Sequence, residues 1–283
     1  SRELMTQQNK RFRVWLQSFS EEYFDFAEKN IFIPNEEWLD YTKLSELKKF
    51  DKIICKSTLG QQLLRPYNNN VVVGGFISKD RYNPTVKKEN KFIHVMGKSA
   101  QKGTECVLNN FNQPNQNLPI TIIESRDGCT LDKMYTDSNF NYIKGFITEE
   151  EMNAEFNKHS MHLCPSIYEG WGHYMYEALS TGALTYVTKI PMFLEWLDPD
   201  LVVFLNCKFE QLNPSRTNIH FLNVDRENTT HQFGWLVDQN DLNENIDNYK
   251  QHLEKHDPNK VRKFFLHLNQ KNSNTLIEEI INV

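Results

Sequence analysis

Two carboxylates, Glu169 and Glu177, flank a short glycine-containing turn and are separated by seven residues. Because the turn 170–172 precedes a helical pattern, Glu177 should lie about one turn or more inside the helix, on a face that looks back toward the turn. Glycines let backbone N–H groups approach a ligand, and the first turn of a helix favours an anion such as phosphate. Phosphate-binding amides between two hydroxyl-accepting carboxylates suit a sugar nucleotide.

Short apolar runs alternate with helical patterns from about Lys91 onward. Strands are predicted at residues 92–96, 120–123, 142–143, 161–164 and 184–187. Helices are predicted at 103–110, 148–159 and 173–180, the second opened by a Thr148–Glu151 capping box. This alternation predicts a parallel sheet covered on both faces, with ligands beyond the carboxyl ends of its strands. The loops at Gly97 and Glu169 both follow such ends.

The first part of the chain has a weaker pattern. Strands are expected at 12–16, 51–55 and 71–73, and the polar segment 79–90, which holds Pro84, is the best candidate for an interdomain linker. After Pro258, apolar residues at helical spacing predict a long C-terminal helix.

Composition excludes several classes of protein. The 283 residues are 39% hydrophobic and carry a net charge of −5, so the chain lacks the broad basic field of a general nucleic-acid binder. No apolar run is long enough for a membrane span, and the N-terminus shows no secretory pattern. The five cysteines have no CxxC spacing, and neither they nor the histidines have zinc spacing. We therefore expect a cytoplasmic protein with reduced thiols.

Four segments carry a family resemblance. Residues 95–103 (VMGKSAQKG), 165–178 (PSIYEGWGHYMYEA), 180–183 (STGA) and 234–237 (GWLV) with Asp241 occur in this order. In this arrangement the chain resembles the retaining GT-B glycosyltransferases of the "glycosyl transferases group 1" family. The first segment resembles the loop whose cationic side chains hold the donor diphosphate, and the second resembles the E-x7-E signature.

The resemblance implies roles for individual residues. The donor diphosphate would be bound by Lys98, Lys102, Gly170, Trp171, Gly172 and His173. Glu177 would accept hydrogen bonds from the ribose hydroxyls, and Glu169, with Gly170, would contact the transferred sugar. Glu169 and Lys102 would be the catalytic residues, because Glu169 lies near the reacting carbon and Lys102 stabilises the leaving nucleoside diphosphate. Relatives of this kind need no metal or cofactor, so none is expected. Taken singly, each residue also fits a solvated surface role.

The implied fold is α/β and GT-B-like, with two Rossmann-like lobes built on parallel sheets. Residues 1–84 would form the acceptor-side lobe, and residues 85–283 the donor-binding lobe with the C-terminal helices. No Gly-rich loop precedes residue 74, so the N-terminal lobe is expected to be reduced or truncated.

The resulting hypothesis is a retaining, metal-independent glycosyltransferase that moves a hexose from a nucleoside-diphosphate sugar to an acceptor hydroxyl of a carbohydrate or glycoconjugate. One alternative is a non-catalytic nucleotide-sugar-binding or scaffold subunit with a degenerate acceptor lobe. A second is a glycosyltransferase acting on nucleic acid, for which the only basic cluster is formed by Lys43, Lys48, Lys49, Lys52 and Lys56. Because apolar residues interrupt that cluster, a solvated helix face explains it better. The sequence leaves the base, the sugar, the acceptor and the oligomeric state open.

Overall fold

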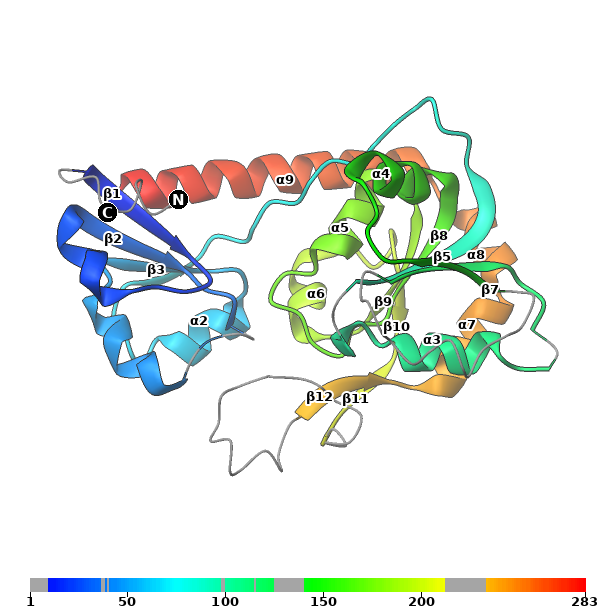
Figure 1. The fold of residues 1–283 in the computed structure, drawn as a ribbon, viewed down its shortest axis with the longest axis horizontal. Helices are drawn as coiled ribbons and strands as arrows, with labels where there is room; N and C mark the ends of the chain where they lie inside the picture. Colours follow the sequence, from blue (N-terminus) through cyan, green and yellow to red (C-terminus); the bar gives the residue numbers. More distant parts are fainter. Residues whose placement is uncertain are drawn as a thin grey trace. The chain divides into compact units, whose positions relative to one another are not determined.

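A computed structural model describes residues 10–36, 39, 41–97, 100–114, 116–124, 140–211 and 233–283 (Figure 1). These residues form two compact units. One comprises residues up to Ile77 together with residues 268–283, and the other comprises the described residues from Ser78 to His267. The sequence suggested a boundary after residue 84, inside the polar segment that follows Ile77.

The first unit is built on a four-stranded parallel sheet in the order β1-β2-β3-β4. Its strands are β1 (Lys10–Leu16), β2 (Ala27–Ile33), β3 (Lys52–Cys55) and β4 (Val71–Val73). The connections contain the 3₁₀ helices η1 (Glu21–Phe26) and η3 (Tyr41–Lys49) and the helix α2 (Thr58–Leu64). An aromatic-rich core that includes Phe32, Phe50 and Ile53 packs on one face of this sheet.

The lysine cluster of the first unit is a solvated helix face only in part: Lys43, Lys48 and Lys49 are exposed on η3, whereas Lys52 and Lys56 are buried. Lys52 and Lys56 are only 5% and 3% exposed, and Lys52 forms an ion pair with Glu279 at 2.9 Å. Lys49 pairs with Glu21 at 2.6 Å. The expectation of one solvated face was therefore wrong for Lys52 and Lys56, because both lie at the ends of the buried strand β3.

The second unit is built on a six-stranded parallel sheet in the order β10-β9-β8-β5-β6-β7. Its strands are β5 (Glu89–Gly97), β6 (Ile120–Glu124), β7 (Phe140–Lys144), β8 (His159–Cys164), β9 (Leu184–Thr188) and β10 (Val203–Leu205). The five strands predicted in this region are confirmed. A separate antiparallel pair joins β11 (Cys207–Gln211) to β12 (Phe233–Val237).

Helices cover both faces of the larger sheet (Figure 1). They are η4 (Ala100–Lys102), α3 (Thr104–Phe111), α4 (Glu149–Lys158), α5 (His173–Ser180), α6 (Pro191–Trp196), α7 (Gln239–Asp247), α8 (Tyr249–Lys255) and, up to His267, the first part of α9 (Pro258–Ile281). Successive strand residues point to opposite faces. Met161 and Leu163 of β8 therefore share a core with α3 and α7, whereas His162 packs against Phe156 of α4.

Local signals set the ends of the helices around the sheet. Thr148 and Glu151 form the predicted capping box at the start of α4, with each side chain bonded to the other's backbone N–H. Gly172, in the left-handed conformation, directly precedes α5. The predicted α/β architecture is therefore present, with one parallel sheet in each of two units and the smaller sheet in the unit that holds the N-terminal residues.

Candidate functional site

Three of the segments that the sequence singled out meet at the carboxyl edge of the larger sheet. The loop after β5 and the loop after β8 are joined by a hydrogen bond from the Ile167 N–H to the Gln101 carbonyl oxygen, at 2.7 Å. The Ile167 carbonyl oxygen in turn accepts from the Trp235 N–H of β12 at 2.9 Å. Backbone bonds fix main-chain positions whatever the side chains, so these three segments are held against one another at this edge of the sheet.

Two glycines make this close approach possible. Gly103 has a φ of +67°, and a Cβ built there would collide with the carbonyl oxygen of Pro165. Gly172 has a φ of +87°, and its Cβ would lie 2.7 Å from the ring of Phe193. Left-handed backbone favours glycine, and both positions also lack room for a side chain. The first glycine brings the Lys102 loop onto the Glu169 loop, and the second sets the start of α5.

Lys102 and Glu169, the two predicted catalytic residues, form an ion pair. Their side chains are 20% and 9% exposed, so the pair is shielded but reachable. The Ser166 hydroxyl donates to the same Glu169 oxygen, Oε1, at 2.7 Å, and the Lys102 ammonium lies 4.4 Å from the centre of the Tyr174 ring. The fold thus brings a cation and a carboxylate from two distant loops to one point. Lys98, the other predicted diphosphate ligand, lies outside the described residues.

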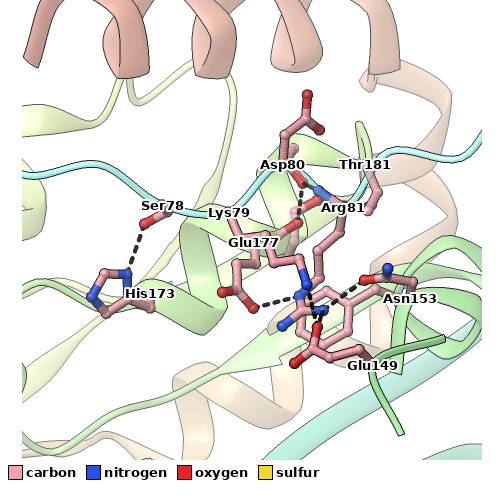
Figure 2. A network of polar contacts seen from close by, with 12 residues as sticks. Ser78, Lys79, Asp80, Arg81, Glu149, Asn153, His173, Glu177 and Thr181 are labelled. Atoms are coloured by element: carbon pink, nitrogen blue, oxygen red, sulfur yellow. Dashed lines mark hydrogen bonds and ion pairs between the residues drawn. The ribbon is translucent and has the colours of Figure 1, made fainter. Parts of the chain in front are cut away.

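The residues at the start of α5 are linked through Ser78. The Trp171 indole N–H donates to the Ser78 hydroxyl at 3.0 Å, and the same hydroxyl lies 3.1 Å from Nδ1 of His173 (Figure 2). The indole is buried and stacks on Tyr176 at 4.5 Å. Any contact of Trp171 with an anion would therefore come from its backbone. His173 is exposed, and Gly170 and Gly172 are buried beside it.

Glu177 is held by an arginine that the sequence did not single out. Nε of Arg81 donates to Oε2 of Glu177 at 2.6 Å, and Nη1 donates to Asn153 at 2.6 Å and to Glu149 at 3.1 Å (Figure 2). Burial raises the pKa of Glu177, and the guanidinium of Arg81 opposes that rise. Arg81 lies in the polar segment expected to be a linker, where no sequence pattern marks a binding or positioning residue.

The predicted residues thus fall into two groups. Lys102 and Glu169 lie together on the paired loops, and His173 and Glu177 lie four residues apart on α5, where they share one helical face. No direct polar contact joins Glu169 to Glu177 in the part of the chain that the structure describes. The α5 N-terminus lies between the two carboxylates along the chain, as the sequence predicted.

Other features of the second unit have structural roles. Asp198 accepts from the Asp200 N–H at 2.9 Å, so the Asp-Pro-Asp stretch at 198–200 forms a turn. Asp241 binds the backbone and the side-chain amide of Asn206, at 2.8 and 2.7 Å. Among the described residues, no group of three or more His, Cys, Asp or Glu side chains is arranged to hold a metal ion. None of the described helices is both long and apolar enough to cross a bilayer.

No protein-family model matches the chain, and no curated protein matches its sequence. Solved structures do match its fold. Sucrose-phosphate synthase from Thermosynechococcus elongatus matches with a TM-score of 0.64 at 12% identity, over 94% of this chain and 69% of that chain. A trehalose-6-phosphate synthase studied for glycosyl transfer with retention matches with a TM-score of 0.68 at 10% identity, over 99% and 76% of the two chains.

A third match is the pneumococcal O-GlcNAc transferase in complex with UDP and GlcNAc. Its TM-score is 0.61 at 12% identity, over 100% of this chain and 60% of that chain. Likeness at such low identity establishes a shared fold and leaves the chemistry to the site. The chain therefore has the GT-B fold of these glycosyltransferases.

Proposed function

We propose that this protein is a retaining glycosyltransferase that moves a hexose from a nucleoside-diphosphate sugar to an acceptor hydroxyl. The observation that carries the proposal is the Lys102–Glu169 ion pair, held by two loops at the carboxyl edge of a parallel sheet and beside the N-terminus of α5. Open α/β sheets bind their ligands at this edge. The shared fold with glycosyltransferases supports the same assignment.

The chemistry needs positive potential where the leaving group forms. When the bond between the sugar and the diphosphate breaks, negative charge grows on the diphosphate oxygens, and preorganised cations and N–H groups lower the barrier. Lys102 supplies an ammonium, and the first turn of α5 after Gly172 supplies the positive end of the helix dipole. We assign the donor diphosphate to Lys98, Lys102, His173 and the 170–172 turn, with no requirement for a metal ion.

The two carboxylates would bind the two ends of the donor. Glu169 would accept hydrogen bonds from the hydroxyls of the transferred sugar, and Lys102 would exchange its contact with Glu169 for one with the diphosphate. Glu177 would accept from the ribose. The acceptor, which we assign to the carbohydrates and glycoconjugates, would supply the hydroxyl that receives the transferred sugar.

Nucleotide binding tests the donor half of this proposal. UDP, GDP, ADP and CMP, with their common sugar conjugates, are screened by thermal shift, and dissociation constants are then measured by calorimetry. Lys102→Ala should weaken binding of the preferred nucleoside diphosphate by about tenfold or more, because a charge-assisted contact is lost. Lys91→Ala is the matched control. It breaks a Lys–Glu pair of 2.6 Å near the opposite end of β5 and should leave binding unchanged.

Turnover tests the catalytic half. Incubation with the preferred sugar nucleotide and an acceptor panel, followed by NMR of the anomeric proton, should show a product with the anomeric configuration of the donor. Glu169→Gln should lower turnover more than it lowers nucleotide affinity. Binding without transfer or hydrolysis would support the non-catalytic binding subunit instead, and binding to none of the nucleotides would reject both.

A further inference from the structure

The polar segment after Ile77 is docked onto α5. Residues 78–82, the docked segment, contact both ends of this helix: Ser78 lies against His173, and the Arg81 N–H donates to the Ser180 hydroxyl at 2.9 Å (Figure 2). The Arg81 carbonyl oxygen accepts from Asn157 of α4 at 2.6 Å. With both backbone groups of Arg81 bonded inside one unit, the segment is part of the donor-side lobe and not a free tether.

A second anchor holds the docked segment independently of Arg81. Arg262 of α9 forms two hydrogen bonds of 2.6 Å to the carboxylate of Asp80 and a third, of 2.8 Å, to the carbonyl oxygen of Ser180. A bidentate arginine–carboxylate pair gives geometric restraint as well as energy. Removing the Arg81 side chain would therefore leave the segment attached to α5.

The Arg81 side chain is held by contacts from Nε, from Nη1 and from the face of its guanidinium. It is 8% exposed, its guanidinium lies 5.0 Å from the centre of the Phe156 ring, and it donates to Glu177, Glu149 and Asn153. Three directed bonds from a planar group allow one orientation. An arginine held in this way fixes the orientation of the carboxylates to which it donates.

Glu177 uses one of its two oxygens in this contact. Oε2 accepts from Arg81, and Oε1 has no hydrogen-bond partner within the described parts of the chain. The carboxylate is 14% exposed, so a ligand can reach it. Figure 2 shows one oxygen directed at Arg81 and the other directed away from it. A carboxylate pinned at one oxygen presents the other in a defined direction.

We propose that Arg81 is a positioning residue that holds Glu177 for recognition of a ribose diol and so gives the site its preference for ribonucleotides. The proposal rests on the proposed function, because it assumes that Glu177 meets the ribose of the donor. What it adds is the residue that orients this carboxylate: Glu177 belongs to α5, whereas Arg81 belongs to the docked segment. The Nη2 group of Arg81 has no partner among the described residues. Because the guanidinium is planar, the three bonds from Nε and Nη1 also fix the orientation of Nη2.

The charges around Glu177 make the same arrangement dependent on pH. Burial and the nearby Glu149 raise the pKa of Glu177, whereas Arg81 and Lys79 lower it. Loss of the guanidinium would therefore raise this pKa further, and the carboxylate would protonate at a higher pH. Nucleotide affinity should then fall at a higher pH in a variant without Arg81 than in the wild type.

The test compares the preferred nucleoside diphosphate with its 2′,3′-dideoxy analogue by calorimetry. Wild type should bind the ribose form about tenfold or more tightly than the analogue. Arg81→Gln should reduce this preference to about threefold or less. Arg81→Lys keeps the positive charge but loses the planar set of N–H donors, and it should retain part of the preference. Arg262→Gln is the matched control: it loosens the docked segment without touching Glu177 and should keep the full preference.

A double-mutant cycle completes the test. In a Glu177→Gln background, Arg81→Gln should have no further effect on the ribose preference, because Arg81 acts through Glu177. The inference would be overturned if Arg81→Gln kept the wild-type ribose preference and lost nucleotide affinity at the same pH as the wild type. It would also be overturned if Arg262→Gln lost as much of the ribose preference as Arg81→Gln. Either result would leave the proposed function intact. Failure of the wild type to bind any nucleoside diphosphate would remove the proposed function, and this inference with it. If Arg81→Gln does not fold, Arg81→Lys decides the same question.

Discussion

The closest backbone approach in the site, that of Gly103 to Pro165, predicts a large effect of one methyl group. Gly103 has a φ of +67°, and a Cβ there would meet the Pro165 carbonyl oxygen, with the Pro165 carbonyl carbon at 2.9 Å and Cγ at 3.3 Å. The left-handed backbone costs an alanine about 1–2 kcal/mol. The steric overlap adds about 1–3 kcal/mol, since backbone atoms cannot rotate aside. Gly103→Ala should therefore lower the free energy of unfolding by about 2–5 kcal/mol.

Gly97 provides the matched control. Its φ is +60°, and no atom of the described residues lies within 4 Å of a Cβ built there. Gly97→Ala should therefore cost only the backbone part, about 1–2 kcal/mol. Urea unfolding followed by circular dichroism, with the two alanines compared in one buffer, measures the difference.

The same substitution should also affect the ligand. To relieve the overlap, the 100–103 loop must move away from Pro165, and Lys102 would then separate from Glu169. Gly103→Ala is thus expected to weaken nucleoside-diphosphate binding, even at temperatures where the variant is fully folded. Equal destabilisation by the two alanines would refute the close approach and, with it, the argument that Gly103 sets the Lys102–Glu169 geometry.

Three further predictions concern other parts of the second unit. Burial lowers the pKa of His94 to about 4, so between about pH 6.5 and 4 the unfolded chain binds a proton that the folded chain does not. The free energy of unfolding should fall by up to about 1.4 kcal/mol per pH unit across that window, and urea titrations should show a flatter pH dependence for His94→Gln. Thr148→Ala removes the capping box of α4 and should cost about 1 kcal/mol, whereas Thr148→Ser should cost much less; equal losses would contradict the capping role. Replacing Phe146, which is 92% exposed just beyond β7, by alanine should change the free energy of unfolding by no more than about 0.5 kcal/mol. If its ring stacks on the nucleobase, the same change should weaken nucleotide binding by about 1–3 kcal/mol, and unchanged affinity would exclude that contact.

Much of the larger sheet was predictable because its signals are local. The strands at β5, β6, β8 and β9 are short apolar runs bounded by turn residues, and the capping box lies within four consecutive residues. Strand β2 was missed, since its first three residues, Ala27-Glu28-Lys29, are polar or weakly apolar and only the last four are buried. Its burial comes from its place between β1 and β3, which no neighbour in sequence indicates.

The candidate site likewise has local features that the sequence predicted and long-range contacts that it did not. The glycines, the carboxylates and the start of α5 were predictable, because a turn that opens a helix needs particular residue types at fixed spacing. The long-range pairings were not. Residues buried by distant elements, such as Arg81 and Lys52, have the polarity of surface residues, and pattern analysis therefore assigned them to a linker and to a solvated face.

By itself, the sequence determined which chemical groups are available and which loops carry them. Only the tertiary structure decided their partners: Lys102 with Glu169 across 67 residues of chain, and Arg81 with Glu177 across 96. The physical reason is that helix and turn formation depend on residues a few positions apart. The pairing of two side chains at such separations depends on how the whole sheet is ordered and which helices cover it.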